Sequence, residues 1–162
     1  MSIFENIFSA LNKAKIAYLV VGGVAVNLHG YTRFTGDLDL LVLLKEKNLE
    51  KLDRVMKKMH YSERIPVSIL ELHDNEKVRK WLKTKNLKAY SFLPPAQTLL
   101  QIDIIIEESL KFDHFYQKKI TKRINGVSIP IACIDDLILM KRHANRMQDV
   151  NDIQALIDLK RL

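Results

Sequence analysis

Three aspartates in strand-like segments of this chain have the residue type and spacing of a metal site. Asp37 and Asp39 flank one leucine in GDLDLLV, and Asp103 lies in the apolar run LLQIDIII. Because side chains alternate across a strand, Asp37 and Asp39 share one face. If the strand that contains Asp103 is adjacent, the three carboxylates converge and raise one another's pKa. A divalent cation relieves this repulsion, and hard oxygen ligands without clustered histidine or cysteine favour Mg²⁺ or Mn²⁺ over zinc.

Two glycines precede the acidic pair and indicate a phosphate-binding turn. Gly22 and Gly23 follow a buried strand at the mouth of a short helix, where backbone N–H groups can approach a phosphate closely. Each feature alone has an ordinary explanation: Gly-Gly forms tight turns, Asp-x-Asp is common at solvated edges, and Asp103 could pair with an arginine. Together they describe a phosphate cradle facing a metal site, which phosphoryl or nucleotidyl transfer requires.

The elements that must position these residues alternate between helices and strands. Hydrophobic periodicity predicts helices over residues 2–15, 24–28, 46–60, 74–84 and 112–119, and two more that start near 134 and 147. Strands are predicted over 16–21, 37–44, 87–93 and 98–106, a strand or extended piece over 66–72, and a hairpin over 120–131 that turns at Asn125-Gly126. This order predicts an α/β or α+β fold, with a mixed central sheet flanked by helices and with C-terminal helices.

Composition and charge restrict the class of protein. The 162 residues fit one domain over 1–162, with a core at about 16–131 and a C-terminal helical element at about 134–161. The single cysteine, Cys133, excludes an intramolecular disulfide and suits a reducing compartment. The start is not typical of a secretory signal and no apolar run could span a membrane, so we expect a cytoplasmic protein. The formal charge of +7 favours polyanionic partners: nucleotides, nucleic acid or an acidic protein.

The chemistry-bearing residues resemble the nucleotidyltransferase superfamily, which is typified by DNA polymerase beta and the minimal nucleotidyltransferases. The resemblance rests on Gly22-Gly23, on Arg33-x-Thr35-x-Asp37-x-Asp39 and on the third aspartate, Asp103. It is stronger to the bacterial AbiEii-type nucleotidyltransferase-like proteins, which occur as toxins in toxin–antitoxin and abortive-infection systems. That similarity includes the segments 134–141 and 146–152, and it covers the chain from about Tyr18 onward.

The resemblance implies a role for each site residue. Asp37 and Asp39 would hold two Mg²⁺ ions. Asp103 would help to hold the catalytic ion and is a candidate to accept the proton of the attacking hydroxyl. The Gly22 and Gly23 amides would bind the triphosphate. Many family members have serine after the first glycine, where this chain has Gly23; the phosphate contact of that hydroxyl is then missing, unless Thr35 supplies it.

Three further residues are candidates for phosphate contacts. Arg33 and Thr35 lie on the turn before the acidic pair, where they could reach a phosphate, although a turn arginine is as often solvated. Lys141 lies on a predicted helix whose apolar face includes Leu137 and Ile138. The resemblance implies that Lys141 contacts the triphosphate, whereas a surface lysine is the alternative.

Other polar residues are interpreted as structural. The spacing of Arg146, Asp149 and Asp152 favours ion pairs at a helix junction. His29 is interpreted as a charge partner of a helix C-terminus rather than as a catalytic base.

Three functions are compatible with these observations. The leading hypothesis is a Mg²⁺-dependent nucleotidyltransferase that moves a nucleoside monophosphate from a nucleoside triphosphate, such as ATP, to a hydroxyl. The acceptor could be an RNA 3′ end, a protein side chain or a small molecule, and a role as a toxin with a cognate antitoxin is a further expectation. The second hypothesis is a catalytically inactive binding module of the same fold, which partners another protein. The third is a nucleic-acid-binding protein that needs no metal.

Overall fold

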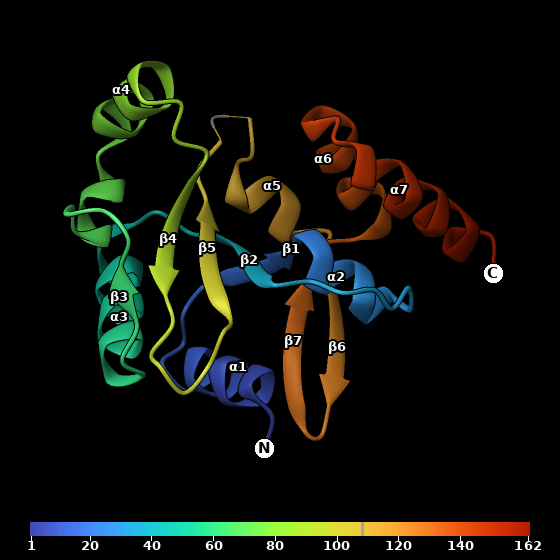
Figure 1. Ribbon diagram of the computed structural model, residues 1–162, viewed down its shortest axis with the longest axis horizontal. Coiled ribbons are helices and arrows are strands. Elements are labelled where there is room, and N and C mark those ends of the chain that lie inside the picture. Colours follow the sequence, from blue (N-terminus) through green and yellow to red (C-terminus); the bar gives the residue numbers. More distant parts are fainter. Residues whose placement is uncertain (108) are drawn as a thin grey trace.

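One mixed sheet forms the centre of the protein in a computed structural model that describes residues 1–107 and 109–162. Within these residues the sheet has seven strands in the order β3-β4-β5-β2-β1-β7-β6 (Figure 1). β1 pairs antiparallel with β2 and parallel with β7, while β2 pairs parallel with β5. The strands are β1 (Tyr18–Val21), β2 (Asp37–Val42), β3 (Ser62–Glu63), β4 (Ala89–Leu93), β5 (Gln101–Ile105), β6 (Ile120–Ile124) and β7 (Val127–Ile131).

Helices surround this sheet, and the last two lie beside α2 at one end of the molecule (Figure 1). Among the described residues, no helix combines the length and the apolar character that crossing a bilayer requires. The mixed sheet, the flanking helices and the C-terminal pair confirm the predicted fold class. The helices are α1 (Ile3–Lys13), α2 (Gly22–His29), α3 (Glu46–Lys58), the 3₁₀ helix η1 (Ile69–His73), α4 (Asn75–Thr84), α5 (Phe112–Tyr116), α6 (Ile134–Ala144) and α7 (Met147–Lys160).

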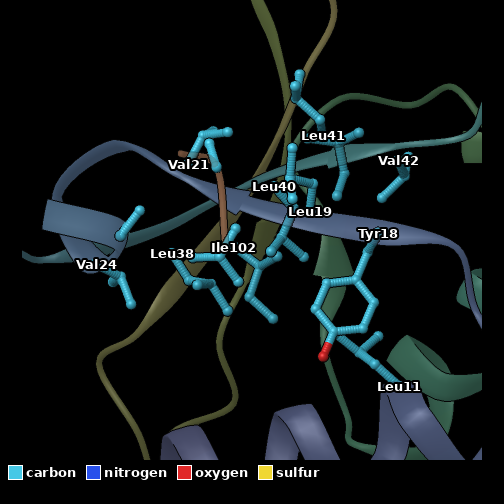
Figure 2. Packing of buried hydrophobic residues seen from close by; sticks show 14 of the residues in the cluster. Leu11, Tyr18, Leu19, Val21, Val24, Leu38, Leu40, Leu41, Val42 and Ile102 are labelled. Atoms are coloured by element: carbon cyan, nitrogen blue, oxygen red, sulfur yellow. The ribbon is translucent and has the colours of Figure 1, made fainter. Parts of the chain in front are cut away.

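One face of the central strands is fully apolar and forms the core with α1. Leu38 and Leu40 of β2 lie opposite Ile102 and Ile104 of β5, and all four side chains are inaccessible to solvent. Figure 2 shows Tyr18 extending from β1 toward Leu11 of α1. Since side chains alternate along a strand, this arrangement turns the intervening aspartates of β2 and β5 to the opposite face.

Local sequence signals explain where several elements begin and turn. Ser2 and Glu5 form a capping box at the start of α1. Asp74 accepts hydrogen bonds from the first backbone N–H groups of α4. Asn125 and Gly126 have φ values of 48° and 83°, as a type I′ turn requires, so the predicted hairpin is confirmed.

The prediction of a strand or extended piece over 66–72 is wrong. This segment leads into η1, and Ser68 caps it by accepting a hydrogen bond from the Leu70 amide at 3.2 Å. Ile69 and Leu72 are both fully buried. Their spacing of three residues matches the 3₁₀ period, which places both side chains on the same side.

Candidate active site

The parallel pairing of β2 with β5 brings the three predicted carboxylates together. Asp39 lies directly opposite Asp103, and Asp37 lies directly opposite Gln101. Directly opposite residues point to the same face of a sheet, so Asp37, Asp39 and Asp103 all lie on the face away from the apolar core. The expectation that the two acidic strands are neighbours is confirmed.

Burial and mutual repulsion perturb this cluster. Burial, with the charges of Asp103 and Asp37 adding to it, raises the pKa of Asp39 to about 6. Burial and then Asp103 also raise the pKa of Asp37, against the opposing effect of the Arg64 guanidinium. The side-chain amide of Gln101 donates a hydrogen bond of 2.8 Å to Asp103 Oδ1. The cluster is therefore a site where negative charge is costly and a cation is favoured.

The donor chemistry fits a divalent cation, although the ligand geometry is not preformed. Over the described parts of the chain, no three His, Cys, Asp or Glu side chains are arranged to hold a metal ion. The acidic residues nevertheless offer only hard oxygen atoms, which Mg²⁺ and Mn²⁺ prefer. Burial and the charges of Asp103 and Asp37 raise the pKa of Asp39 more than the charges of Arg146 and Lys141 lower it, so a bound cation would favour its ionised form.

The first turn of α2 approaches these carboxylates closely because it begins with glycine. Gly22 has φ +64°, and a Cβ atom there would lie 2.1 Å from Asp39 Oδ2. Any side chain at this position would collide with the carboxylate, so glycine allows the contact. Within the described structure no side chain caps α2, so its first backbone N–H groups are available to a ligand. An anion bound at this end would lie beside the carboxylate cluster.

The loop between α2 and β2 fills the space that a side chain at position 23 would need. A Cβ atom on Gly23 would lie 2.7 Å from Thr35 Oγ1 and 3.0 Å from Arg33 Nη2. Thr35 Oγ1 also lies 3.2 Å from the carbonyl oxygen of Asp37, to which it donates a hydrogen bond. The Thr35 hydroxyl therefore occupies space beside position 23 that a side chain there would need.

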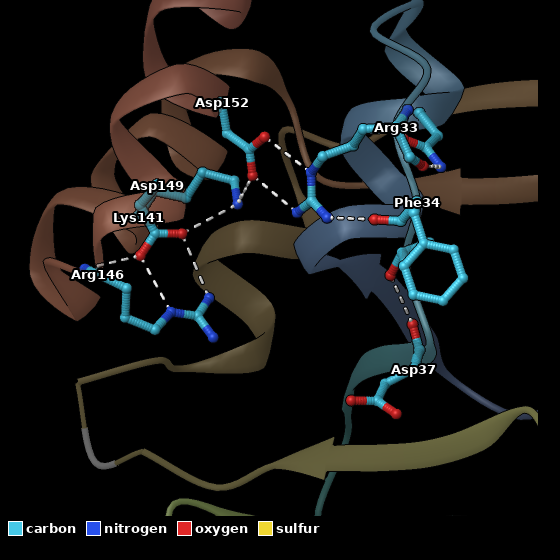
Figure 3. Close-up of polar contacts among 9 residues, drawn as sticks. Arg33, Phe34, Asp37, Lys141, Arg146, Asp149 and Asp152 are labelled. Carbon is cyan, nitrogen blue, oxygen red and sulfur yellow. Dashed lines mark hydrogen bonds and ion pairs between the residues drawn. The ribbon is translucent and has the colours of Figure 1, made fainter.

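Arg33 connects this loop to the C-terminal helices rather than to solvent. Its Nε and Nη2 donate to the two carboxylate oxygens of Asp152 at 2.8 and 2.7 Å (Figure 3). Asn27 of α2 holds the Arg33 backbone on both sides, because it accepts from the Arg33 amide and donates to the Arg33 carbonyl. The bidentate pair fixes the position of the loop that contains Thr35.

Lys141 is buried between the carboxylates of α7. Its ammonium lies 2.7 Å from Asp152 Oδ2 and 3.4 Å from Asp149 Oδ1, and only 4% of the residue is exposed. The alternative of a surface lysine is therefore wrong. Burial favours the neutral forms of Asp149 and Asp152, but hydrogen bonds from Arg146 to Asp149 and from Arg33 and Lys141 to Asp152 hold both pKa values below the ordinary range.

The interpretation of Arg146, Asp149 and Asp152 as ion-pairing residues is confirmed for Arg146 with Asp149. For Asp152 it is incomplete, because the partners of Asp152 are other residues. Arg146 pairs with Asp149 through contacts of 3.1 and 3.3 Å, whereas Asp152 pairs with Arg33 and Lys141 (Figure 3). The charges of Arg146 and Lys141 also lower the pKa of Asp39, against burial and the neighbouring carboxylates.

The interpretation of His29 as a charged partner is wrong. Burial lowers its pKa, and its Nε2 lies 2.8 Å from the carbonyl oxygen of Ala132. Burial therefore disfavours the charged form of His29, and the side chain joins α2 to the segment after β7.

Sequence reasoning missed three residues on the acidic face. Gln101 lies two residues before Asp103, so strand alternation alone could have placed it there. Ser91 lies opposite Asp103 on β4, and the Arg64 amide donates to the Ser91 carbonyl at 3.0 Å. The positions of Ser91 and Arg64 on this face depend on strand register, for which the sequence has no local signal.

The fold is similar to that of several solved structures that are named as nucleotidyltransferases or nucleotidyltransferase-like proteins. The lincosamide antibiotic adenylyltransferase LnuA, bound to lincomycin, aligns with a TM-score of 0.63 and 14% identity over 98% of both chains. ANT(2″)-Ia in complex with adenylyl-2″-tobramycin aligns with a TM-score of 0.60 and 11% identity over 95% of this chain and 85% of that one. An antigenic nucleotidyltransferase-like protein from Paracoccidioides brasiliensis aligns with a TM-score of 0.61 and 16% identity over 96% of this chain and 73% of that one. At these identities the similarity shows the fold alone.

Sequence comparison identifies the family. No curated protein matches the chain in sequence. A family model described as "Nucleotidyltransferase of unknown function (DUF6036)" matches residues 1–161. A match over nearly the whole chain, together with the fold and the acidic face beside α2, places this protein in that nucleotidyltransferase family.

Proposed function

We propose that this protein is a divalent-metal-dependent nucleotidyltransferase, which transfers a nucleoside monophosphate from a nucleoside triphosphate to a hydroxyl acceptor. The carrying observation is the contact between the glycine-started α2 and Asp39, which itself lies opposite Asp103. An anion-binding helix end beside three carboxylates suits a triphosphate and its metal ions. Bound Mg²⁺ or Mn²⁺, held by Asp37, Asp39 and Asp103, would activate the attacking hydroxyl and stabilise the pyrophosphate that leaves.

The chain's own residues bind the phosphates and accept a proton. The free N–H groups of Gly22 and Gly23 donate to the triphosphate. The Thr35 hydroxyl, placed against Gly23, exchanges its hydrogen bond to the Asp37 carbonyl for one to the triphosphate and so replaces the serine that many relatives have. Asp103, oriented by Gln101, accepts the proton of the acceptor hydroxyl.

Lys141 and Arg33 support the phosphate cradle, which consists of Gly22, Gly23 and Thr35, without contacting the triphosphate in this proposal. Both cations bind Asp152, and Arg33 belongs to the loop that carries Thr35. Lys141 thereby holds the cradle in place, in contrast to the direct triphosphate contact that the resemblance implied for it. Arg146, whose side chain is 61% exposed whereas that of Lys141 is buried, is the cation that can reach a phosphate in this proposal.

The acceptor class is a separate part of the proposal. The solved structures include antibiotics as acceptors, lincomycin and tobramycin, which supports a small molecule. An RNA 3′ end and a protein side chain are the other acceptors with a hydroxyl. The toxin role, a cognate antitoxin and a cytoplasmic location stay predictions.

The test combines binding and transfer. Wild-type protein is titrated with each nucleoside triphosphate, with and without Mg²⁺, by calorimetry. It is then incubated with each α-³²P-labelled triphosphate and a total cell extract. We expect metal-dependent binding, and label in RNA, in protein or in a small molecule. The variant with Asp37→Asn and Asp39→Asn should lose transfer and keep its fold by circular dichroism. Transfer by this variant would refute the metal site, and wild-type protein that binds no triphosphate would support the inactive binding module.

A further inference from the structure

Arg64 lies in the same row of the sheet as the acidic cluster. Asp39 is opposite Asp103, and Asp103 is opposite Ser91. The pairing of β3 with β4 places Glu63 opposite Phe92, and the Arg64 amide hydrogen bond to Ser91 continues this register by one residue. Opposite residues share a face, so Asp39, Asp103, Ser91 and Arg64 form one row on the acidic face.

The order of this row gives the reaction a direction, if the proposed function holds. Gly22 and the start of α2 contact Asp39, so the triphosphate lies at that end of the row. In an in-line displacement the attacking hydroxyl enters opposite the leaving pyrophosphate. The acceptor therefore approaches over β5 and β4, toward Ser91 on β4 and Arg64 just after β3. Neighbouring strands are about 4.8 Å apart, which places the Arg64 backbone roughly 10 Å from that of Asp103.

Arg64 gives this end of the row a positive charge. Arg64 is exposed, and no hydrogen bond or ion pair to its side chain occurs between residues that the structure describes. A guanidinium presents a planar set of donors that matches a phosphate, and it repels an ammonium group.

We propose that Arg64, with the Ser91 hydroxyl beside it, binds a phosphate group of the acceptor. The acceptor is then a hydroxyl compound with a phosphate close to the reacting hydroxyl. Two sources share this chemistry: the 3′ end of an RNA strand and a small sugar phosphate. The net charge of +7 favours the RNA end. A polyamine sugar such as tobramycin has the opposite charge and fits this subsite poorly.

The transfer to such an acceptor is balanced by groups already named. The hydroxyl oxygen forms a bond to the α-phosphorus, and its proton passes to Asp103. The bond from the α-phosphorus to the bridging oxygen breaks, and its electron pair leaves with pyrophosphate toward α2. Arg64 takes no part in these bonds; it holds the acceptor phosphate and so selects the acceptor.

The experiment offers three acceptors to the full chain with Mg²⁺ and the four α-³²P-labelled nucleoside triphosphates. The acceptors are a short oligoribonucleotide with a free 3′ hydroxyl, ribose 5-phosphate and tobramycin. Arg64→Glu should lower labelling of the phosphate-bearing acceptors by about tenfold to a hundredfold, and Arg64→Lys should lower it less. Arg123→Glu is the matched control, because Arg123 is also exposed but lies on β6 at the opposite edge of the sheet.

A binding measurement separates this inference from the proposed function. An oligoribonucleotide with a 3′-deoxy end, which cannot react, should bind Arg64→Glu about tenfold or more weakly than wild type. Triphosphate binding by calorimetry should change much less than oligoribonucleotide binding, because Arg64 is proposed to contact the acceptor and not the triphosphate. Unchanged oligoribonucleotide binding and labelling in Arg64→Glu, or preferential labelling of tobramycin, would overturn the inference and leave the proposed function standing. Wild-type protein that binds no triphosphate with Mg²⁺ would overturn both.

Discussion

Replacing Asp39 by asparagine should make the metal-free protein more stable at neutral pH while it removes activity. Burial and the neighbouring carboxylates raise the pKa of Asp39 from 3.8 to about 6. The folded state therefore holds this proton more tightly than the unfolded state does. The contribution to stability is fully present below about pH 4 and is lost as the pH rises toward 6. This difference between the folded and unfolded pKa values corresponds to about 3 kcal/mol of unfolding free energy. Solvent screening of the partly exposed side chain reduces the expected gain in stability of Asp39→Asn to about 2 kcal/mol.

Urea denaturation at about pH 4 and about pH 7.5, in the absence of divalent metal, measures this effect. We expect equal stabilities near pH 4, and a variant that is more stable by about 2 kcal/mol at the higher pH. Added Mg²⁺ should stabilise the wild type only, because the metal binds its folded state. Asp158→Asn is the matched control: Asp158 is exposed on α7, and its removal should change stability by less than about 0.5 kcal/mol. A variant that is no more stable than wild type at about pH 7.5 would refute the electrostatic account.

Three further predictions concern the cradle and its support. Lys141→Met leaves two buried carboxylates without their shared cation and should lower the free energy of unfolding in urea by about 3–5 kcal/mol; a loss below about 1 kcal/mol would show that the pairing is weak. Gly22→Ala should abolish metal-dependent triphosphate binding in calorimetry, whereas Gly126→Ala, which also has positive φ but meets no atom within 4 Å, should lower only the melting temperature. Thr35→Val should weaken triphosphate binding about tenfold and Thr35→Ser should preserve it, and equal affinities would exclude the hydroxyl as a phosphate donor.

Most of the fold could be predicted from the sequence because its signals are local. The apolar run before Gly22 predicts β1, and the alternation around Asp37 and Asp39 predicts β2 and its buried face. Asn125-Gly126 predicts the hairpin, since both residues tolerate positive φ. The sequence predicts the wrong structure for segment 66–72 because its apolar residues fit a short strand as well as a helix. The spacing of Ile69 and Leu72 was the signal that could have separated the two.

The site was predictable only where chemistry and local pattern coincide. The position of Asp37 and Asp39 on one strand face follows from side-chain alternation. Their proximity to Asp103 follows only if the two strands are assumed to be neighbours. The bond from Arg33 to Asp152 joins residues 119 positions apart, and the position of Arg64 beside Ser91 depends on register. Neither contact can be predicted from the local sequence around its residues. The sequence identifies Lys141 as a charged residue, but its burial follows from the packing of α6 on α7.

The pairing of Arg33 with Asp152 has a consequence for the newly synthesised chain. The two residues are 119 positions apart, so at roughly 5–20 residues per second a ribosome needs roughly 6–24 seconds to add the second after the first. During that interval the cradle loop has no carboxylate from α7 to hold it. The glycines, Thr35 and all three site aspartates are translated before Asp152, yet the loop acquires its fixed position only when α7 emerges and folds. Assembly of the nucleotide cradle is thereby postponed to a late step of biosynthesis, and a nascent protein that stalls earlier contains the site residues without the assembled site.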